Sequence, residues 1–172
     1  MEIDKVEHST TPGVFKHAVE TYGDRVAMRI KEFGLWRDIS WNAYLKRVQY
    51  IAAALMALGL EKEQCASIIG DNCHEWVEID LGIQFAGGIS VGIYATNAPP
   101  QVQYVVENSD SMILFVENEE QLDKWLSFRD EVPSLKKVIV WDLEGLRNFT
   151  DPMLMTFDEL LELGKAEFDK DP

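Results

Sequence analysis

The chain has 172 residues, with 16 lysines and arginines against 30 aspartates and glutamates, and therefore a net charge of −14. Hydrophobic residues make up 47% and charged residues 27%, which is typical of a folded globular protein and excludes a disordered chain. A strongly acidic chain lacks the cationic face that nucleic acid requires, so we expect no nucleic-acid partner, and anionic membrane surfaces are disfavoured for the same reason. The length favours a single domain.

The cysteines and the apolar runs bear on the cellular environment. Cys65 and Cys73 are too few for a disulfide framework, and their spacing fits no zinc site. The first residues, Met1–His8, lack the basic and then apolar regions of a secretory signal. The longest uncharged run, Leu81–Val106, is interrupted by glycines, prolines and amides, so it is not expected to cross a membrane. We expect a cytoplasmic location.

The first third of the chain predicts two helices around a β-hairpin, after a flexible N-terminus over residues 1–10. Thr11 precedes Pro12, which is typical of a helix N-cap followed by the first helical position, and this helix is expected to end at Tyr22. Ser40 is expected to cap a second, long amphipathic helix that ends at Gly59. The predicted hairpin strands are Val26–Ile30 and Leu35–Ile39.

Beyond Gly59, short apolar runs alternate regularly with helical segments. The predicted strands are Ala66–Ile69, Ile89–Tyr94, Met112–Val116 and Val138–Trp141. The predicted helix starts are Asn72 with Glu75, Pro99-Pro100, Asn118, and Thr156 with Glu159. The corresponding helices are expected to end near Phe85, near Asn108, before Pro133 and near Phe168. This alternation predicts an α/β fold, with a mostly parallel sheet flanked by helices and a small separate β-hairpin near the N-terminus.

A turn with the sequence Gly70-Asp71-Asn72 follows the first strand of this alternation. Open α/β sheets usually bind ligands at the carboxyl ends of their strands, so Asp71 could contact a ribose or a metal ion. The competing interpretation is that glycine, aspartate and asparagine only form the turn and cap the next helix. The residues alone favour the second interpretation.

No group of residues predicts a catalytic or metal centre. Cys73 lies at the expected start of a helix, which can favour a thiolate, but the sequence suggests no paired base. His74-Glu75 begins like the zinc motif His-Glu-x-x-His, yet Glu78 occupies the place of the second histidine. His8 and His17 have no nucleophile at a recognisable spacing. We therefore assign no catalytic residue and no metal ligand.

Three segments in the middle of the chain carry a resemblance to a known family: Ile68–Asn72, Glu75-Trp76 and Gln84–Thr96. Flanking segments agree in the same order: Tyr22–Ala27, Ile39–Trp41, Gln101–Tyr104, Asn108–Asp110 and Phe115–Asn118. Together they resemble the N-terminal region of AMP-forming acyl-CoA synthetases, in particular the long-chain fatty acid branch with its bubblegum-type members. The resemblance covers about residues 11–142.

Complete members of this family use ATP and Mg²⁺ to convert a carboxylic acid to an acyl-adenylate with release of pyrophosphate. They then transfer the acyl group to CoA and release AMP. The resemblance implies that residues 11–172 are an N-terminal α/β segment, an incomplete part of a larger domain. The family's ATP loop, its Mg²⁺-binding glutamate and its C-terminal catalytic lysine match nothing here. The implied partners are the remainder of the ligase chain and its substrates, and the segment alone is expected to be inactive.

Two residues are the best candidates for proximity to the nucleotide or the acyl group in the complete enzyme. Tyr94 and Thr96 follow a predicted strand, in a loop that resembles Tyr-x-Thr of long-chain members. The alternative is a loop that only packs against the missing part. The resemblance also leaves open a homodimer and peripheral membrane attachment of the complete enzyme. If this segment is cut from a larger domain, an uncovered apolar face should promote association.

Two other function classes compete with the ligase segment. A stand-alone α/β binding or scaffolding module would share the fold without catalysis. A phosphoacceptor signalling domain would need clustered acids after its first strand and a lysine after its last strand. Asp71 is not accompanied by such acids or by such a lysine, so this second alternative ranks low.

Overall fold

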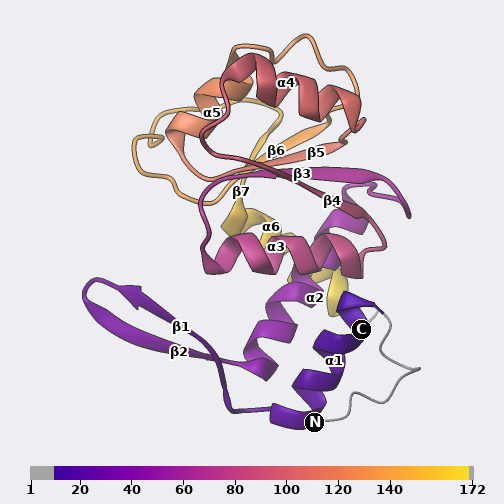
Figure 1. Cartoon of the computed structure of the whole chain (residues 1–172), viewed down its shortest axis with the longest axis vertical. Helices are drawn as coiled ribbons and strands as arrows, with labels where there is room; N and C mark the ends of the chain where they lie inside the picture. The colour runs from indigo at the N-terminus through magenta and orange to yellow at the C-terminus, as the bar shows by residue number, and fades with distance from the viewer. Residues whose placement is uncertain (1–9, 171–172) are drawn as a thin grey trace.

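A parallel sheet of five strands forms the centre of the molecule (Figure 1). The structure, a computed structural model, describes residues 10–170. The strand order is β4–β3–β5–β6–β7, and every neighbouring pair is parallel. The strands are β3 (Cys65–Ile69), β4 (Ile89–Ile93), β5 (Ile113–Val116), β6 (Lys137–Val140) and β7 (Leu154–Thr156). The predicted fold class is confirmed.

Helices cover both faces of this sheet (Figure 1). One face carries α4 (Pro99–Asn108) and α5 (Glu119–Leu126). The other face carries α2 (Trp41–Ala57), α3 (His74–Phe85) and α6 (Phe157–Phe168), with α1 (Thr11–Tyr22) packed outside α2 and α3. The connection β3–α3–β4 moves toward one edge of the sheet, and β4–α4–β5 returns in the opposite direction, past β3. Crossovers of one hand therefore place α3 and α4 on opposite faces.

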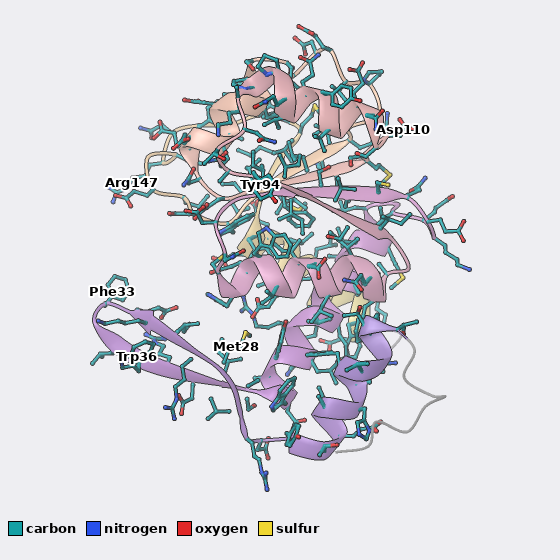
Figure 2. All side chains as sticks on the ribbon, in the orientation of Figure 1. Met28, Phe33, Trp36, Tyr94, Asp110 and Arg147 are labelled. Carbon is teal, nitrogen blue, oxygen red and sulfur yellow. The ribbon has the colours of Figure 1, made fainter. Side chains whose placement is uncertain are left out.

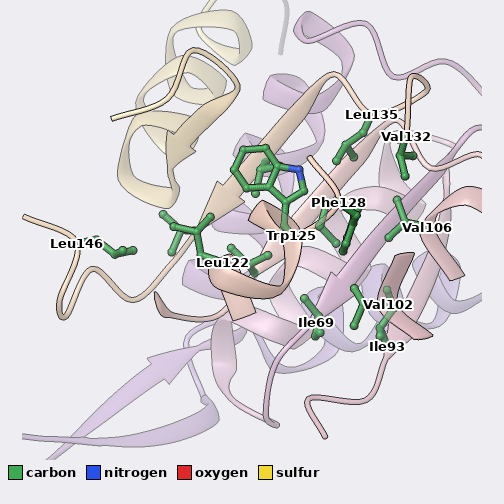
Figure 3. Close-up of a cluster of buried hydrophobic side chains, with 14 residues drawn as sticks. Ile69, Ile93, Val102, Val106, Leu122, Trp125, Phe128, Val132, Leu135 and Leu146 are labelled. Atoms are coloured by element: carbon green, nitrogen blue, oxygen red, sulfur yellow. The ribbon is translucent and has the colours of Figure 1, made fainter. Parts of the chain in front are cut away.

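The central strands contribute side chains to two separate hydrophobic cores, one on each face of the sheet. Side chains alternate across the sheet, so Leu114 and Val116 of β5 face α4 and α5, whereas Ile113 and Phe115 face α2, α3 and α6. Figure 3 shows the first core, in which Trp125 of α5 lies over the strands. Because both faces are covered, these strands appear in the sequence as continuous apolar runs rather than as alternating ones.

A two-stranded hairpin, β1 (Val26–Glu32) and β2 (Leu35–Ser40), projects from the helices as an arm (Figure 1). Its turn residues Phe33 and Gly34 have φ angles of 48° and 81°. Positive φ at both positions is typical of the type I′ turn. This turn is favoured in two-residue hairpins because its twist matches that of the flanking strands. The predicted hairpin is confirmed, with each strand slightly longer than expected.

The helix caps show where local sequence patterns are accurate and where they are not. Ser40, Asn118 and Thr156 each accept a backbone hydrogen bond from the first turn of their helix, as predicted. Two predicted caps are displaced by one residue. The side chain that caps α1 is Thr10 rather than Thr11, and the one that caps α3 is Cys73 rather than Asn72.

The displaced caps have a physical cause. The Thr10 hydroxyl accepts the Gly13 N–H at 3.2 Å, so the helix begins one residue earlier than the proline suggested. The Cys73 Sγ accepts the Trp76 N–H at 3.4 Å, so Asn72 stays in the turn before α3.

Strand β7 was not predicted, because a three-residue strand leaves too short an apolar pattern to recognise. The predicted flexible segment 1–10 and His8 lie outside the described residues, apart from Thr10. In the part of the chain that is described, no helix is long and apolar enough to cross a bilayer.

Candidate functional site

A crevice of about 390 Å³ opens at the carboxyl ends of β3 and β4. It lies at the carboxyl edge of the parallel sheet, which is the edge where open α/β sheets bind ligands. The lining residues are Gly70, Asp71, Asn72, Trp76, Gly92, Ile93, Tyr94, Ala95 and Thr96. All four residues that the sequence singled out therefore line one crevice.

The turn after β3 is shaped by contacts with the loops after β5 and β6. The Asp71 N–H donates to Glu117 Oε2 at 2.7 Å, and the Asp142 N–H donates to the Glu117 carbonyl at 2.7 Å. A Cβ on Gly70 would lie 2.5 Å from the Trp141 ring and 2.8 Å from the Glu117 Cβ. The close packing explains the glycine. It also directs the exposed side chains of Asp71 and Asn72 to the rim of the crevice.

The start of α3 forms the floor of the crevice. The Trp76 ring lies against β4, and a Cβ on Gly92 would be 3.4 Å from it. Burial, together with the charge of Glu75, raises the pKa of the Cys73 thiol to about 12. Cys73 is therefore a neutral thiol that caps α3 and not a thiolate nucleophile. The N-cap of α3, which the sequence predicts at Asn72, is therefore Cys73.

The segment 94–98 between β4 and α4, which we call the 94–98 loop, supplies Tyr94, Ala95 and Thr96 to the lining of the crevice. Tyr94 and Thr96 are exposed along it, and Figure 2 shows Tyr94 at the end of β4. The Asn97 N–H donates to the Tyr94 carbonyl at 3.0 Å, which closes a turn. From α5, the Lys124 ammonium donates to the Ala95 carbonyl at 2.5 Å.

Sequence reasoning missed Lys124 and Glu117. The available signal for Lys124 was its position beside the apolar face of α5, between the buried Gln121 and Trp125. No signal in the sequence pointed to Glu117, because its partner Asp71 is 46 residues away.

Ionisable groups gather along α3, on the side that faces α2. Glu78 is fully buried, and its Oε2 accepts from Arg47 Nε at 2.7 Å while its Oε1 has no partner. Burial raises the pKa of Glu78 above its usual value, although Arg47 opposes that shift.

Close by, His74 Nδ1 lies 3.0 Å from Glu75 Oε2. Burial lowers the pKa of His74, but the hydrogen bond and charge of Glu75 outweigh it and hold the pKa above its ordinary value. None of these four side chains lines the crevice, so they supply no acid or base to it. The Arg47–Glu78 pair joins α2 to α3, and the His74–Glu75 pair lies within α3.

The lining of the crevice bears on which groups it can hold. It contains one carboxylate, from Asp71, and no lysine or arginine side chain. A triphosphate needs positive charge or a nest of backbone N–H groups, so its phosphates do not fit this crevice as it stands. The described residues contain no group of three or more histidine, cysteine, aspartate or glutamate side chains placed to hold a metal ion. The exposed Tyr94 ring and Thr96 hydroxyl suit an uncharged or planar part of a ligand.

Comparison with known proteins gives the family. The sequence profile of the AMP-binding enzymes matches residues 15–156. The chain belongs to the AMP-binding enzyme family. Of its relatives, long-chain-fatty-acid–CoA ligase ACSBG2 of Xenopus laevis is 38% identical over 154 residues, which are 88% of this chain and 20% of that protein. The human ACSBG2 ligase is 35% identical over 158 residues, 91% of this chain and 23% of that protein.

Solved structures of adenylate-forming enzymes share the fold of this AMP-binding family member. The anthranilate CoA ligase AuaEII, in complex with anthranoyl-AMP, superposes with a TM-score of 0.78 at 19% identity, over 94% of this chain and 29% of that one. Acetoacetyl-CoA synthetase from Streptomyces lividans gives a TM-score of 0.76 at 20% identity, over 87% of this chain and 24% of that one. The chain thus spans about a fifth of the curated relatives it matches, and the match lies in their N-terminal part.

Proposed function

We propose that this chain is the N-terminal segment of an AMP-forming long-chain-fatty-acid–CoA ligase. The observation that carries the proposal is the 38% identity over 88% of the chain to a long-chain-fatty-acid–CoA ligase. In the complete enzyme, the fatty acid carboxylate attacks the α-phosphorus of ATP, and pyrophosphate leaves. The CoA thiol then attacks the acyl carbon, and AMP leaves with the bonding electrons.

The contribution of this segment is the crevice at the carboxyl ends of β3 and β4. Tyr94 and Thr96 present a ring and a hydroxyl at the carboxyl edge of the sheet, and Asp71 and Asn72 form the opposite rim. The phosphates and CoA are held by elements outside this chain, because the crevice has no cationic lining. Mg²⁺ is held there too, because the described residues contain no cluster of carboxylates or histidines that could bind it. The 172-residue chain by itself therefore neither forms acyl-adenylate nor consumes ATP.

Pyrophosphate release tests this proposal. The purified 172-residue chain is incubated with ATP, Mg²⁺ and palmitate, beside a longer protein that continues in frame beyond Pro172. We expect pyrophosphate from the longer protein and none from the chain alone. Release by the chain alone contradicts its inactivity, and an inactive longer protein contradicts the ligase assignment. An in-frame Thr/Ser/Gly-rich loop that ends in Pro-Lys is the expected feature of the continuation.

We further propose a cytoplasmic location, with the complete ligase able to attach peripherally to membranes and to form a homodimer. Large apolar side chains such as Phe33, Leu35 and Trp36 are exposed and support self-association of the isolated chain. Light scattering over a wide concentration range measures this. A mass that stays at the monomer value throughout contradicts association of the segment.

A further inference from the structure

Lys124, on α5, turns its charged end inward. The Lys124 side chain is 12% exposed, whereas the lysines at 62, 165 and 170 keep more than half of their side-chain surface in solvent. Burying an ammonium group costs free energy unless it is paired and hydrogen-bonded. Lys124 therefore needs a specific reason for its position.

The position of Lys124 is explained by what its ammonium contacts. Nζ donates to the Ala95 carbonyl at 2.5 Å and lies 3.5 Å from Glu120 Oε1, one turn earlier on α5. Glu120 is largely exposed, so it balances charge without anchoring the lysine. The charge-assisted bond to the backbone is the stronger of the two contacts. It joins α5 to the 94–98 loop across 29 residues of sequence.

The other hydrogen bonds that the structure shows within residues 95–98 are local or reach only into α4. The Asn97 N–H returns to Tyr94, and the Ala98 N–H is capped by Gln101 Oε1 at 2.9 Å. Strand β4, which precedes the loop, is at the edge of the sheet and has a neighbour on one side only. The bond from Lys124 is thus what ties the middle of the loop to the body of the molecule.

We propose that Lys124 is a positioning residue for the ligand crevice. By holding the carbonyl between Tyr94 and Thr96, it sets the direction in which both side chains leave the loop. Lys124 does not itself line the crevice. The inference rests on the proposed function in one respect, that this crevice contacts a ligand in the complete ligase.

The first test measures the loop in the 172-residue chain by hydrogen–deuterium exchange. Lys124→Met removes the donor and keeps the aliphatic stem, and Lys124→Arg restores a donor. Lys136→Met is the matched control, because Lys136 Nζ also donates to a backbone carbonyl, that of Pro133 at 2.8 Å, at an exposed position away from the crevice.

We expect exchange of the 94–98 amides to accelerate about tenfold in Lys124→Met, which is the size of effect that losing one charge-assisted hydrogen bond produces. Exchange in β3 and β5 should stay unchanged, Lys124→Arg should return the loop toward the wild-type rate, and Lys136→Met should have no effect on it. Unchanged loop exchange in Lys124→Met, or equal acceleration throughout the sheet, overturns the proposal.

The second test uses the longer ligase that continues beyond Pro172. A positioning role predicts that Lys124→Met raises KM for the fatty acid or ATP by about tenfold with a smaller change in kcat, and that Lys124→Arg recovers most of it. A KM that stays at the wild-type value, with the loop loosened, overturns the link between loop and ligand. Wild-type ligase activity is measured in the same assay, so failure of the proposed function is seen separately.

Discussion

The five-stranded sheet and the hairpin arm show two different ways of holding strands in one chain. In the sheet, Phe115 and its neighbours on β5 are fully buried between two layers of helices. In the arm, Phe33 is 100% exposed at the tip, and Leu35 and Trp36 are 70% and 67% exposed (Figure 2). Aromatic and branched residues favour strands in both regions, but only in the sheet do they remove apolar surface from water.

The arm is held by its own turn and by pairs across its two strands. Arg29 Nε lies 2.8 Å from Asp38 Oδ1, and the Lys31 ammonium lies 5.9 Å from the centre of the Trp36 ring. Only its base, through Met28 and Ile39, packs against the core of α1 and α2. Because an isolated two-stranded hairpin is marginally stable, the comparison teaches that burial against a second layer decides what a strand residue contributes.

The largest expected effect compares one phenylalanine from each region. Phe115→Ala leaves a cavity in the core and should lower the free energy of unfolding by about 3–5 kcal/mol. Phe33→Ala, at the exposed tip, should change it by no more than about 0.5 kcal/mol. Urea unfolding followed by circular dichroism measures both. Comparable losses of unfolding free energy in the two variants would contradict the difference between the sheet and the arm.

The next effect tests how closely the helices are packed behind the sheet. A Cβ on Gly164 of α6 would collide with the backbone carbonyl of Tyr50 on α2. Gly164→Ala should therefore force α6 away from α2 and lower the free energy of unfolding by about 1–3 kcal/mol, despite the higher helix propensity of alanine. Lys165→Ala, at the next and exposed position, is the control. A stabilised Gly164→Ala variant contradicts the close approach of these helices.

A smaller effect comes from the sheltered pair of His74 and Glu75 at the start of α3. The pKa of His74 is raised in the folded state, so its contribution is complete below the unfolded value of about 6.5 and is lost as pH rises through the folded value. Burial raises the pKa of Glu75, but the hydrogen bond with His74 outweighs it and lowers that pKa overall. The contribution of Glu75 is therefore lost as pH falls through its folded value.

Stability from this pair should be greatest between about pH 4.3 and 6.5 and decline toward pH 8, by about 1 kcal/mol or less. Urea unfolding of wild type and His74→Gln across this range measures the change. The same slope between about pH 6.5 and 8 in both proteins would show that His74 is not its source.

The smallest effect belongs to the exposed pair on the arm. Arg29→Gln removes an ion pair whose side chains are 65% and 50% exposed, so the free energy of unfolding should change by about 0.5 kcal/mol or less. High salt should remove even that difference, because it screens exposed charges. Chemical denaturation at low and high salt is the measurement. A salt-independent loss above about 1 kcal/mol would place the arm among the buried parts of the structure.

Patterns that lie within a few residues of sequence predicted most of the fold. Apolar runs such as Met112–Val116, and caps such as Ser40 and Thr156, each depend on neighbours within one turn or one strand. The candidate site was predicted in part. Asp71, Asn72, Tyr94 and Thr96 line one crevice because the carboxyl ends of adjacent parallel strands meet at one edge. A ligand at these residues remains a prediction.

The sequence by itself determined the α/β fold class, the hairpin and the strand–helix alternation, since these follow from short-range spacing of apolar and turn residues. The family resemblance rests instead on the identity of particular segments, such as Gln84–Thr96. Only the tertiary structure decided that Cys73 caps α3, that Glu117 shapes the turn after β3, and that Lys124 holds the 94–98 loop. The Cys73 cap depends on a one-residue choice of helix start, and local propensities are too similar to decide it. The other two contacts join residues 46 and 29 positions apart, and which of them meet depends on the strand order of the assembled sheet.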